Sequence, residues 1–181
     1  MSEFKQYFKK ILIIALVIYV SFLLQTSIFS KYRLAGVTPN ILICVVATYG
    51  FMNGRKQGIL VGFFTGILLD MFSGGIFGIY AMMYMYIGFL NGLFKKQFFG
   101  DDLRLPMFLI GMSDLLYGVS SYFVFIAIRA KYNFSFYFMN LILPEVVYTL
   151  LISIFVYYAI LYLNNWLEKL EKKGSDRLGN Y

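Results

Sequence analysis

The sequence predicts an all-α integral membrane protein, a six-transmembrane-helix bundle in a single membrane domain covering residues 1–181. Its composition is 60% hydrophobic and 14% charged, whereas soluble domains are roughly 45–50% apolar and about 25% charged. Its mean hydropathy is +0.72. The Lys and Arg residues lie between long apolar runs and at the two ends of the chain, which is the distribution that membrane proteins show.

Composition also excludes several classes of function. The chain has no histidine and a single cysteine, Cys44. Disulfides and thiolate metal sites within one chain are therefore excluded, and so are metalloproteases, lipid phosphatases and intramembrane proteases that depend on histidine. The net charge of +7 does not indicate a nucleic-acid partner, because the cations flank apolar runs. We expect a lipid bilayer as surroundings, and no cofactor, no metal and no enzymatic activity.

The first two spans are expected at residues 11–29 and 39–52. The first follows a short basic segment and resembles a signal peptide, but no Ala-x-Ala-like site follows it, which favours an uncleaved signal anchor. Gln25 lies near its far end, where we expect headgroup water, rather than another helix, to satisfy it. Thr38 and Pro39 are predicted as the N-cap and first residue of the second helix, which is short for a span.

The third and fourth spans are expected at residues 57–72 and 75–94, as a hairpin around which the other helices assemble. Both carry glycines at four-residue spacing, which places them on one helical face. Such stripes allow close backbone approach in a bilayer, and internal packing is favoured over a dimerisation face. The predicted helix-packing residues are Gly58, Gly62, Gly66, Gly88 and Gly92.

The hairpin turn is predicted at Ser73, Gly74 and Gly75, just after the acidic residue Asp70. Asp70 is expected in the outer part of the bilayer. A structural role, as a polar contact between helices or a group that fixes this turn, or a contact with a partner protein is favoured for Asp70. The functional alternatives are a proton relay, a cation site or a protease dyad.

The fifth and sixth spans are expected at residues 105–128 and 136–163. They contain Asp114 and Glu145 near mid-membrane, where acids are costly and often functional. A proton relay, a cation site and polar contacts between helices remain open, and hydroxyls such as those of Tyr84, Tyr117 and Tyr148 are expected to bond the acids. An aspartyl protease is disfavoured, because neither Asp70 nor Asp114 follows the Gly-x-Gly that such enzymes show.

Pro144 leaves the Asn140 carbonyl without its helical partner and predicts a kink in the sixth span. A packing bend is favoured over a cavity wall or docking groove. Residues 164–181 are expected to form a short amphipathic extension that ends in a polar tail.

Charge predicts the orientation. With six spans and the N-terminus inside, twelve of the sixteen Lys and Arg residues lie on the inner side. The four on the outer side are Lys31, Arg33, Arg129 and Lys131. Excess cations mark the cytoplasmic side, so both termini are predicted to be cytoplasmic.

Residues 38–94 resemble a known family. Thr-Pro-Asn opens a short helix at Thr38, a glycine-striped helix ends in Leu-Leu-Asp at Asp70, and Ser-Gly-Gly-x-x-Gly follows from Ser73 to Gly78. In this order the features resemble the rod shape-determining protein MreD, over nearly the whole chain, although the signature is weaker after about residue 105. Asn40 departs from the family, which often has an acid there, so a partner contact made by that acid is in doubt.

The resemblance implies a non-enzymatic membrane scaffold of the bacterial elongasome in the cytoplasmic membrane. It implies partnership with MreC, a single-span periplasmic protein, and through it with MreB, RodA and a class B transpeptidase in peptidoglycan synthesis. The implied fold is similar to the substrate-binding subunits of energy-coupling-factor transporters. The candidate partner-contact or structural residues are Pro39, Asp70, Ser73, Gly74, Gly75, Gly78, Asp114, Pro144 and Glu145.

That fold supplies the alternative function, a vitamin-binding transporter subunit. Such subunits commonly dock through an Ala-x-x-x-Ala stripe in the first helix. The first apolar run here has a single alanine, Ala15, which counts against this alternative.

Overall fold

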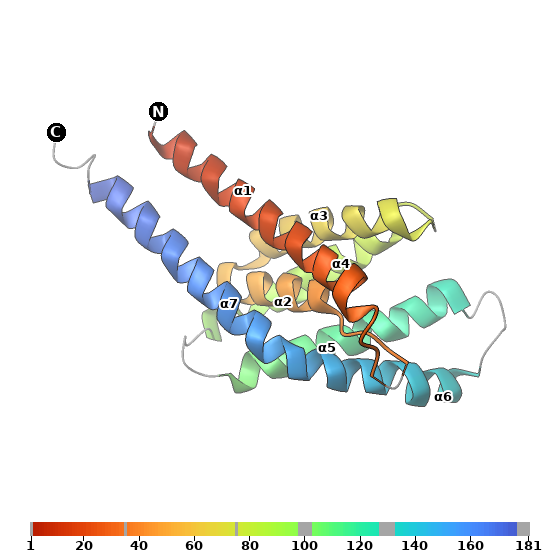
Figure 1. Cartoon of the computed structure of the whole chain (residues 1–181). Helices are drawn as coiled ribbons and strands as arrows, with labels where there is room; N and C mark the ends of the chain where they lie inside the picture. The colour runs from red at the N-terminus through yellow and green to blue at the C-terminus, as the bar shows by residue number, and fades with distance from the viewer. Residues whose placement is uncertain (1, 35, 75, 98–102, 127–132, 177–181) are drawn as a thin grey trace.

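The computed structural model describes residues 2–34, 36–74, 76–97, 103–126 and 133–176, and its elements are helical (Figure 1). Side chains are described for residues 8–34, 36–74, 76–97, 103–124 and 133–167. The elements are α1 (Ser2–Leu23), π-helical η1 (Leu24–Phe29), α2 (Ile41–Asn53), α3 (Arg55–Ser73), α4 (Ile79–Leu93), the 3-10 turn η2 (Phe94–Gln97), α5 (Arg104–Ser121), π-helical η3 (Tyr122–Ile126), α6 (Phe134–Tyr137), π-helical η5 (Phe138–Ile142) and α7 (Leu143–Asp176).

The all-α prediction is confirmed. In the described part of the chain, three helical stretches are long and apolar enough to cross a membrane, at Phe8–Phe29, Arg104–Val124 and Phe134–Leu167. Helix α2 is apolar but has 13 residues, fewer than the roughly 20 that a straight crossing needs. Six crossings therefore stay a prediction.

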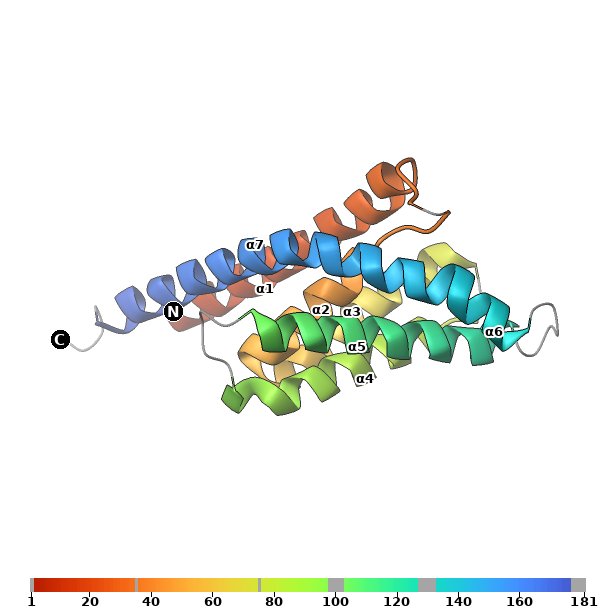
Figure 2. The ribbon, with the colours of Figure 1, turned by 90° about the horizontal axis from the view of Figure 1, so that it is seen from below.

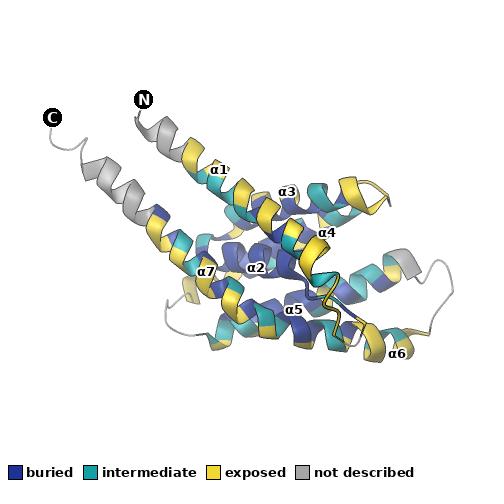
Figure 3. Ribbon diagram, viewed as in Figure 1, coloured by how far each residue is buried: buried dark blue, intermediate teal, exposed yellow. Residues whose placement is uncertain are grey.

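Helix α2 lies at the centre of the bundle. Every residue from Ile41 to Met52 is buried, and α2 packs against α1, α3, α4, α5 and α7, as the dark ribbon in Figure 3 shows. The expectation that the α3–α4 hairpin forms the centre is therefore wrong. A helix that is apolar on all sides is typical of a protein core or of a membrane span. In α2 the neighbouring helices, rather than lipid, cover every face.

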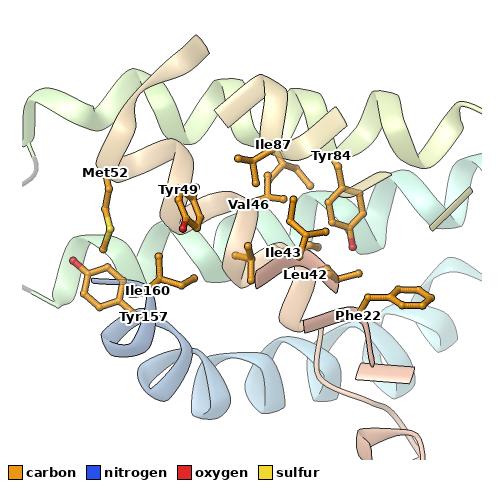
Figure 4. Packing of buried hydrophobic residues seen from close by; sticks show 13 residues of the cluster. Phe22, Leu42, Ile43, Val46, Tyr49, Met52, Tyr84, Ile87, Tyr157 and Ile160 are labelled. Atoms are coloured by element: carbon orange, nitrogen blue, oxygen red, sulfur yellow. The ribbon is translucent and has the colours of Figure 1, made fainter. Parts of the chain in front are cut away.

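The main core forms around α2. In Figure 4, Leu42, Ile43 and Val46 lie between Tyr84 and Ile87 of α4 and the side of the bundle formed by α1 and α7. Tyr157 and Ile160 of α7 close this core near Met52. Aromatic and β-branched side chains thus join segments that are far apart in sequence.

Two predicted boundaries are wrong. Helix α2 begins at Ile41, with Asn40 as N-cap, rather than at Thr38 and Pro39, because the Asn40 side chain accepts a hydrogen bond from the Ile43 amide. The hairpin turn is longer than three residues, since α3 ends at Ser73 and α4 begins at Ile79. Gly74 adopts a left-handed conformation (φ +62°) that glycine favours after a helix end.

Pro144 lies in the first turn of α7, directly after η5. Helical conformation continues from η5 into α7, so the proline removes an amide that would otherwise donate to a carbonyl of the preceding turn. The wider π-helical turn of η5 precedes it and accommodates the change of hydrogen bonding. Pro144 thus lies at the point where the helix changes from π-helical to α-helical.

Helices α1 and α7 cross the outside of the bundle (Figures 1 and 2). Residues of α1, η1, α2 and α7 line a groove between them. The groove has a volume of about 620 Å³, and Ser21 is the one hydroxyl among its otherwise apolar lining residues. Its walls include Leu16, Val45 and Phe155.

Candidate functional site

Asp70 joins the two helices of the hairpin. It is 5% exposed, and its Oδ1 and Oδ2 accept hydrogen bonds from the backbone N–H groups of Tyr80 (3.1 Å) and Ala81 (3.0 Å). These amides belong to the first turn of α4, whose own N-cap, Gly78, has no side chain to cap it. Helix N-termini favour a carboxylate at this position, so Asp70 of α3 caps α4 across the turn.

The glycines of α3 lie against the backbone of α4. A Cβ on Gly58 would meet the carbonyl of Gly88, one on Gly62 the carbonyl of Tyr84, and one on Gly66 the backbone of Ala81. Rigid backbone atoms leave no space there for a methyl group. In this structure the stripe therefore serves internal packing between α3 and α4.

Gly92 has a similar position at the other end of the hairpin. A Cβ there would lie 2.5 Å from both the Cα and the N of Arg55. Gly92 therefore holds the beginning of α3 against the end of α4.

A buried polar cluster surrounds the N-terminus of α2, and Asn40 is at its centre. Asn40 Oδ1 accepts hydrogen bonds from the Ile43 amide (3.3 Å) and the Tyr84 hydroxyl (3.0 Å). Its own backbone N–H donates to Thr149 Oγ1 at 3.0 Å. Asn40 thereby connects α2 with α4 and α7.

Asp114 of α5 adjoins this cluster. Its side chain is 1% exposed, and the side chains of Asn40 and Thr149 face it. Neither carboxylate oxygen has a hydrogen-bond partner of good geometry among the described residues. Glu145 of α7 interacts electrostatically with Asp114 and is partly exposed. The structure brings together two of the three intramembrane acids and leaves Asp70 in a separate site.

The expected tyrosine contacts differ in the structure. Tyr84 bonds Asn40 rather than an acid, and the Tyr148 hydroxyl donates to the backbone carbonyl of Tyr32 at 3.1 Å. Tyr84 reaches Asn40 because helix α4 packs directly on α2. A sequence pattern does not fix which polar partner a buried hydroxyl meets.

Two polar contacts were missed by sequence reasoning. Gln25 Oε1 accepts the Leu42 amide at 3.0 Å, so a helix contact, rather than water, satisfies it. Asn91 Nδ2 donates to Ser113 Oγ at 2.7 Å and joins α4 to α5. The available signal was a polar side chain within an apolar run, which in a membrane protein indicates a hydrogen-bonded contact between helices.

The remaining candidate residues are dispersed. Pro39 is buried just before α2, Ser73 is exposed at the end of α3, and Pro144 is partly exposed. Gly75 lies outside the described residues. Among the described residues there is no group of three His, Cys, Asp or Glu side chains that could hold a metal ion.

Comparison with known proteins identifies the family to which the chain belongs. The family model described as "rod shape-determining protein MreD" matches residues 5–167. No curated protein and no solved structure matches the chain, so the expected similarity to energy-coupling-factor subunits stays a prediction. The family match covers the hairpin, the buried polar cluster and the three long apolar helices, and on this basis the chain belongs to the MreD family of rod shape-determining proteins.

Proposed function

We propose that this protein is a non-enzymatic, multi-pass scaffold of the elongation machinery in the bacterial cytoplasmic membrane. Membership of the MreD family gives it a role in rod shape determination. The proposal adds that it binds an MreC-like single-span protein and, through that protein, MreB, RodA and a class B transpeptidase.

The observation that carries the scaffold proposal is an exposed apolar surface at the tip of the α3–α4 hairpin. Met71, Phe72, Ile76 and Phe77 are each 67–68% exposed. Exposed apolar patches of this kind often mark protein or membrane contacts. The Asp70 cap ties the start of α4 to the end of α3, which supports a defined position for the two helix ends that carry these side chains.

The structural role of Asp70 changes how the partner surface should be tested. Replacing it would free the Tyr80 and Ala81 amides and disturb the hairpin itself. Substitutions of exposed tip residues leave the cap in place. We therefore assign Asp70 a supporting role and place the partner contact on its exposed neighbours.

The test is the recovery of an MreC-like partner with the tagged full chain, purified in mild detergent from its native membrane. The variant Ile76→Ala/Phe77→Ala is expected to reduce apparent affinity roughly tenfold, as truncation of interface anchors commonly does. Mass spectrometry quantifies the recovered partner.

The matched control is Leu60→Ala/Phe64→Ala, which truncates two side chains of α3 that are 52% and 60% exposed. It should retain the partner at the wild-type level. Equal recovery by both variants would refute the hairpin tip as the partner surface, and recovery of ATPase subunits would refute the scaffold proposal.

The groove between α1 and α7 does not favour the vitamin-binding alternative. Pockets for water-soluble ligands combine apolar walls with several convergent polar groups. Apart from Ser21, the residues that line this groove are apolar.

A further inference from the structure

A second concave site lies where the end of α2, the start of α3 and the end of α4 meet. It has a volume of about 540 Å³. Its lining residues are Asn53, Gly54, Arg55, Lys56, Gln57, Gly92, Leu93, Lys95 and Lys96. We propose that this basic pocket binds the phosphate-bearing headgroup of an anionic phospholipid.

The charge of the pocket is the first argument. Arg55, Lys56, Lys95 and Lys96 line it, and no acid does. No ion pair joins these four side chains to a carboxylate within the described part of the chain. Four like charges around one cavity repel one another, and a bound anion would relieve that repulsion. Asp101 and Asp102 lie outside the described residues.

The second argument is the polar groups of the pocket wall. Besides an unpartnered acceptor, Gln57 Oε1, the wall includes donors that an anion could accept. Gly54 is the N-cap of α3 and has no side chain that could cap the helix. The first amide that donates a helical hydrogen bond is that of Gly58, and its acceptor is the Gly54 carbonyl. The amides of Lys56 and Gln57 therefore precede the first bond of the α3 ladder, and amides in this position commonly bind anions. The Arg55 amide faces Gly92 instead. Asn53 Nδ2 is a buried donor without a partner in the same wall.

Two contacts fix part of the pocket. Lys95 Nζ donates to the Asn53 carbonyl at 3.1 Å, which fixes Lys95 over Gly54. The close approach of Gly92 to Arg55 fixes the start of α3 against α4. Lys95 and the backbone at the start of α3 therefore lose little conformational entropy when a ligand binds.

A lipid fits this pocket better than free phosphate does. Leu93 lines the pocket and is 42% exposed, and the adjoining Phe94 is 37% exposed. Apolar surface beside a basic pocket matches a headgroup with attached acyl chains. Basic pockets between transmembrane helices on the cytoplasmic side bind anionic headgroups, and the proposed topology places this end of the hairpin on that side.

The test uses the full chain purified in an uncharged detergent. Short-chain phosphatidylglycerol is titrated into it at fixed ionic strength, with binding followed by calorimetry, and short-chain phosphatidylcholine and inorganic phosphate are titrated in parallel. The site variant is Arg55→Gln/Lys96→Gln, which keeps Lys95 and its bond to Asn53. The control is Lys31→Gln/Arg33→Gln, which also removes one lysine and one arginine, both exposed.

We expect saturable binding of phosphatidylglycerol that weakens roughly 30-fold in the site variant, since each cation contributes to attraction of anionic lipid. Binding should be unchanged in the control. Absence of saturable binding, or equal weakening in both variants, would overturn the proposal. Inorganic phosphate bound as tightly as the lipid, or phosphatidylcholine bound equally well, would also overturn it.

The single variant Lys56→Gln keeps the test decisive if the double variant does not fold. It should weaken binding of phosphatidylglycerol several-fold. Circular dichroism and elution volume identify folded protein for each variant. The readout is lipid binding alone, so its outcome is separate from recovery of an MreC-like partner.

Discussion

At the scale of single residues, Asn40 has several roles that a carboxylate in its place could not perform together. Its Oδ1 caps α2 and accepts the Tyr84 hydroxyl, while its side chain also faces Asp114. An amide offers both an acceptor and a donor, whereas an ionised carboxylate only accepts. Asn40 thus fits beside a buried acid.

We predict that Asn40→Asp destabilises the protein by about 2–3 kcal/mol, because it places a second carboxylate beside Asp114 and removes the amide donor. The midpoint of thermal unfolding in detergent measures the change. Adding Asp114→Asn should restore most of the stability, since it returns one amide and one carboxylate to the cluster. If the double variant is less stable than Asn40→Asp, the two side chains are not coupled in this way.

At the scale of elements, α3 and α4 form the closest pair in the bundle, and two different kinds of contact hold them together. The glycines allow the backbones to approach along the helices, and Asp70 caps α4 at the turn. Close packing is the main attraction between helices in a bilayer, where water does not drive association. Removal of either the glycine packing or the Asp70 cap should therefore weaken the association of α3 with α4, even when the other contact is intact.

Gly62→Ala tests the packing of α3 on α4. The added methyl group would meet the backbone of Tyr84, which cannot move aside, and we expect a loss of about 1–3 kcal/mol in unfolding free energy. Gly111→Ala in α5 is the matched control, because its Cβ would meet only the flexible Leu150 side chain at 3.4 Å. Chemical denaturation in detergent compares the two. A loss in Gly111→Ala as large as that in Gly62→Ala would show that intimate backbone contact is not the cause.

At the scale of the whole molecule, a short buried helix is surrounded by longer ones. Figure 1 shows that α1 begins and α7 ends at the same end of the bundle. The basic turn at Gly54 and the acid-free hairpin tip at residues 71–77 are at opposite ends of α3. This arrangement supports an even number of crossings.

The predicted orientation can be checked by labelling single cysteines. In a Cys44→Ser background, a cysteine replacing Lys31 should react with an impermeant maleimide in spheroplasts. One replacing Lys56 should react only after permeabilisation, because excess cations stay on the cytoplasmic side. The parent chain with Cys44, which is fully buried, should label poorly in either condition. Equal labelling of the two new cysteines in spheroplasts would contradict the six-span arrangement.

The sequence alone was sufficient for the helical class, the approximate positions of the six helical segments and the acids within them. These follow from local properties, namely apolar runs, glycine spacing and isolated charges, which are visible along the chain. The family could also be inferred, because its motifs lie in one continuous stretch from Thr38 to Gly78 and the family match confirms it.

Only the tertiary structure decided which helix is central and which polar groups meet. The contact between Gln25 and Leu42 and the meeting of Asn40, Tyr84 and Thr149 join segments that are far apart in sequence. Most buried polar groups form a hydrogen bond, but the choice of partner depends on how helices pack. In a bilayer that packing is set by the close fit of facing surfaces, which no local pattern in one chain specifies.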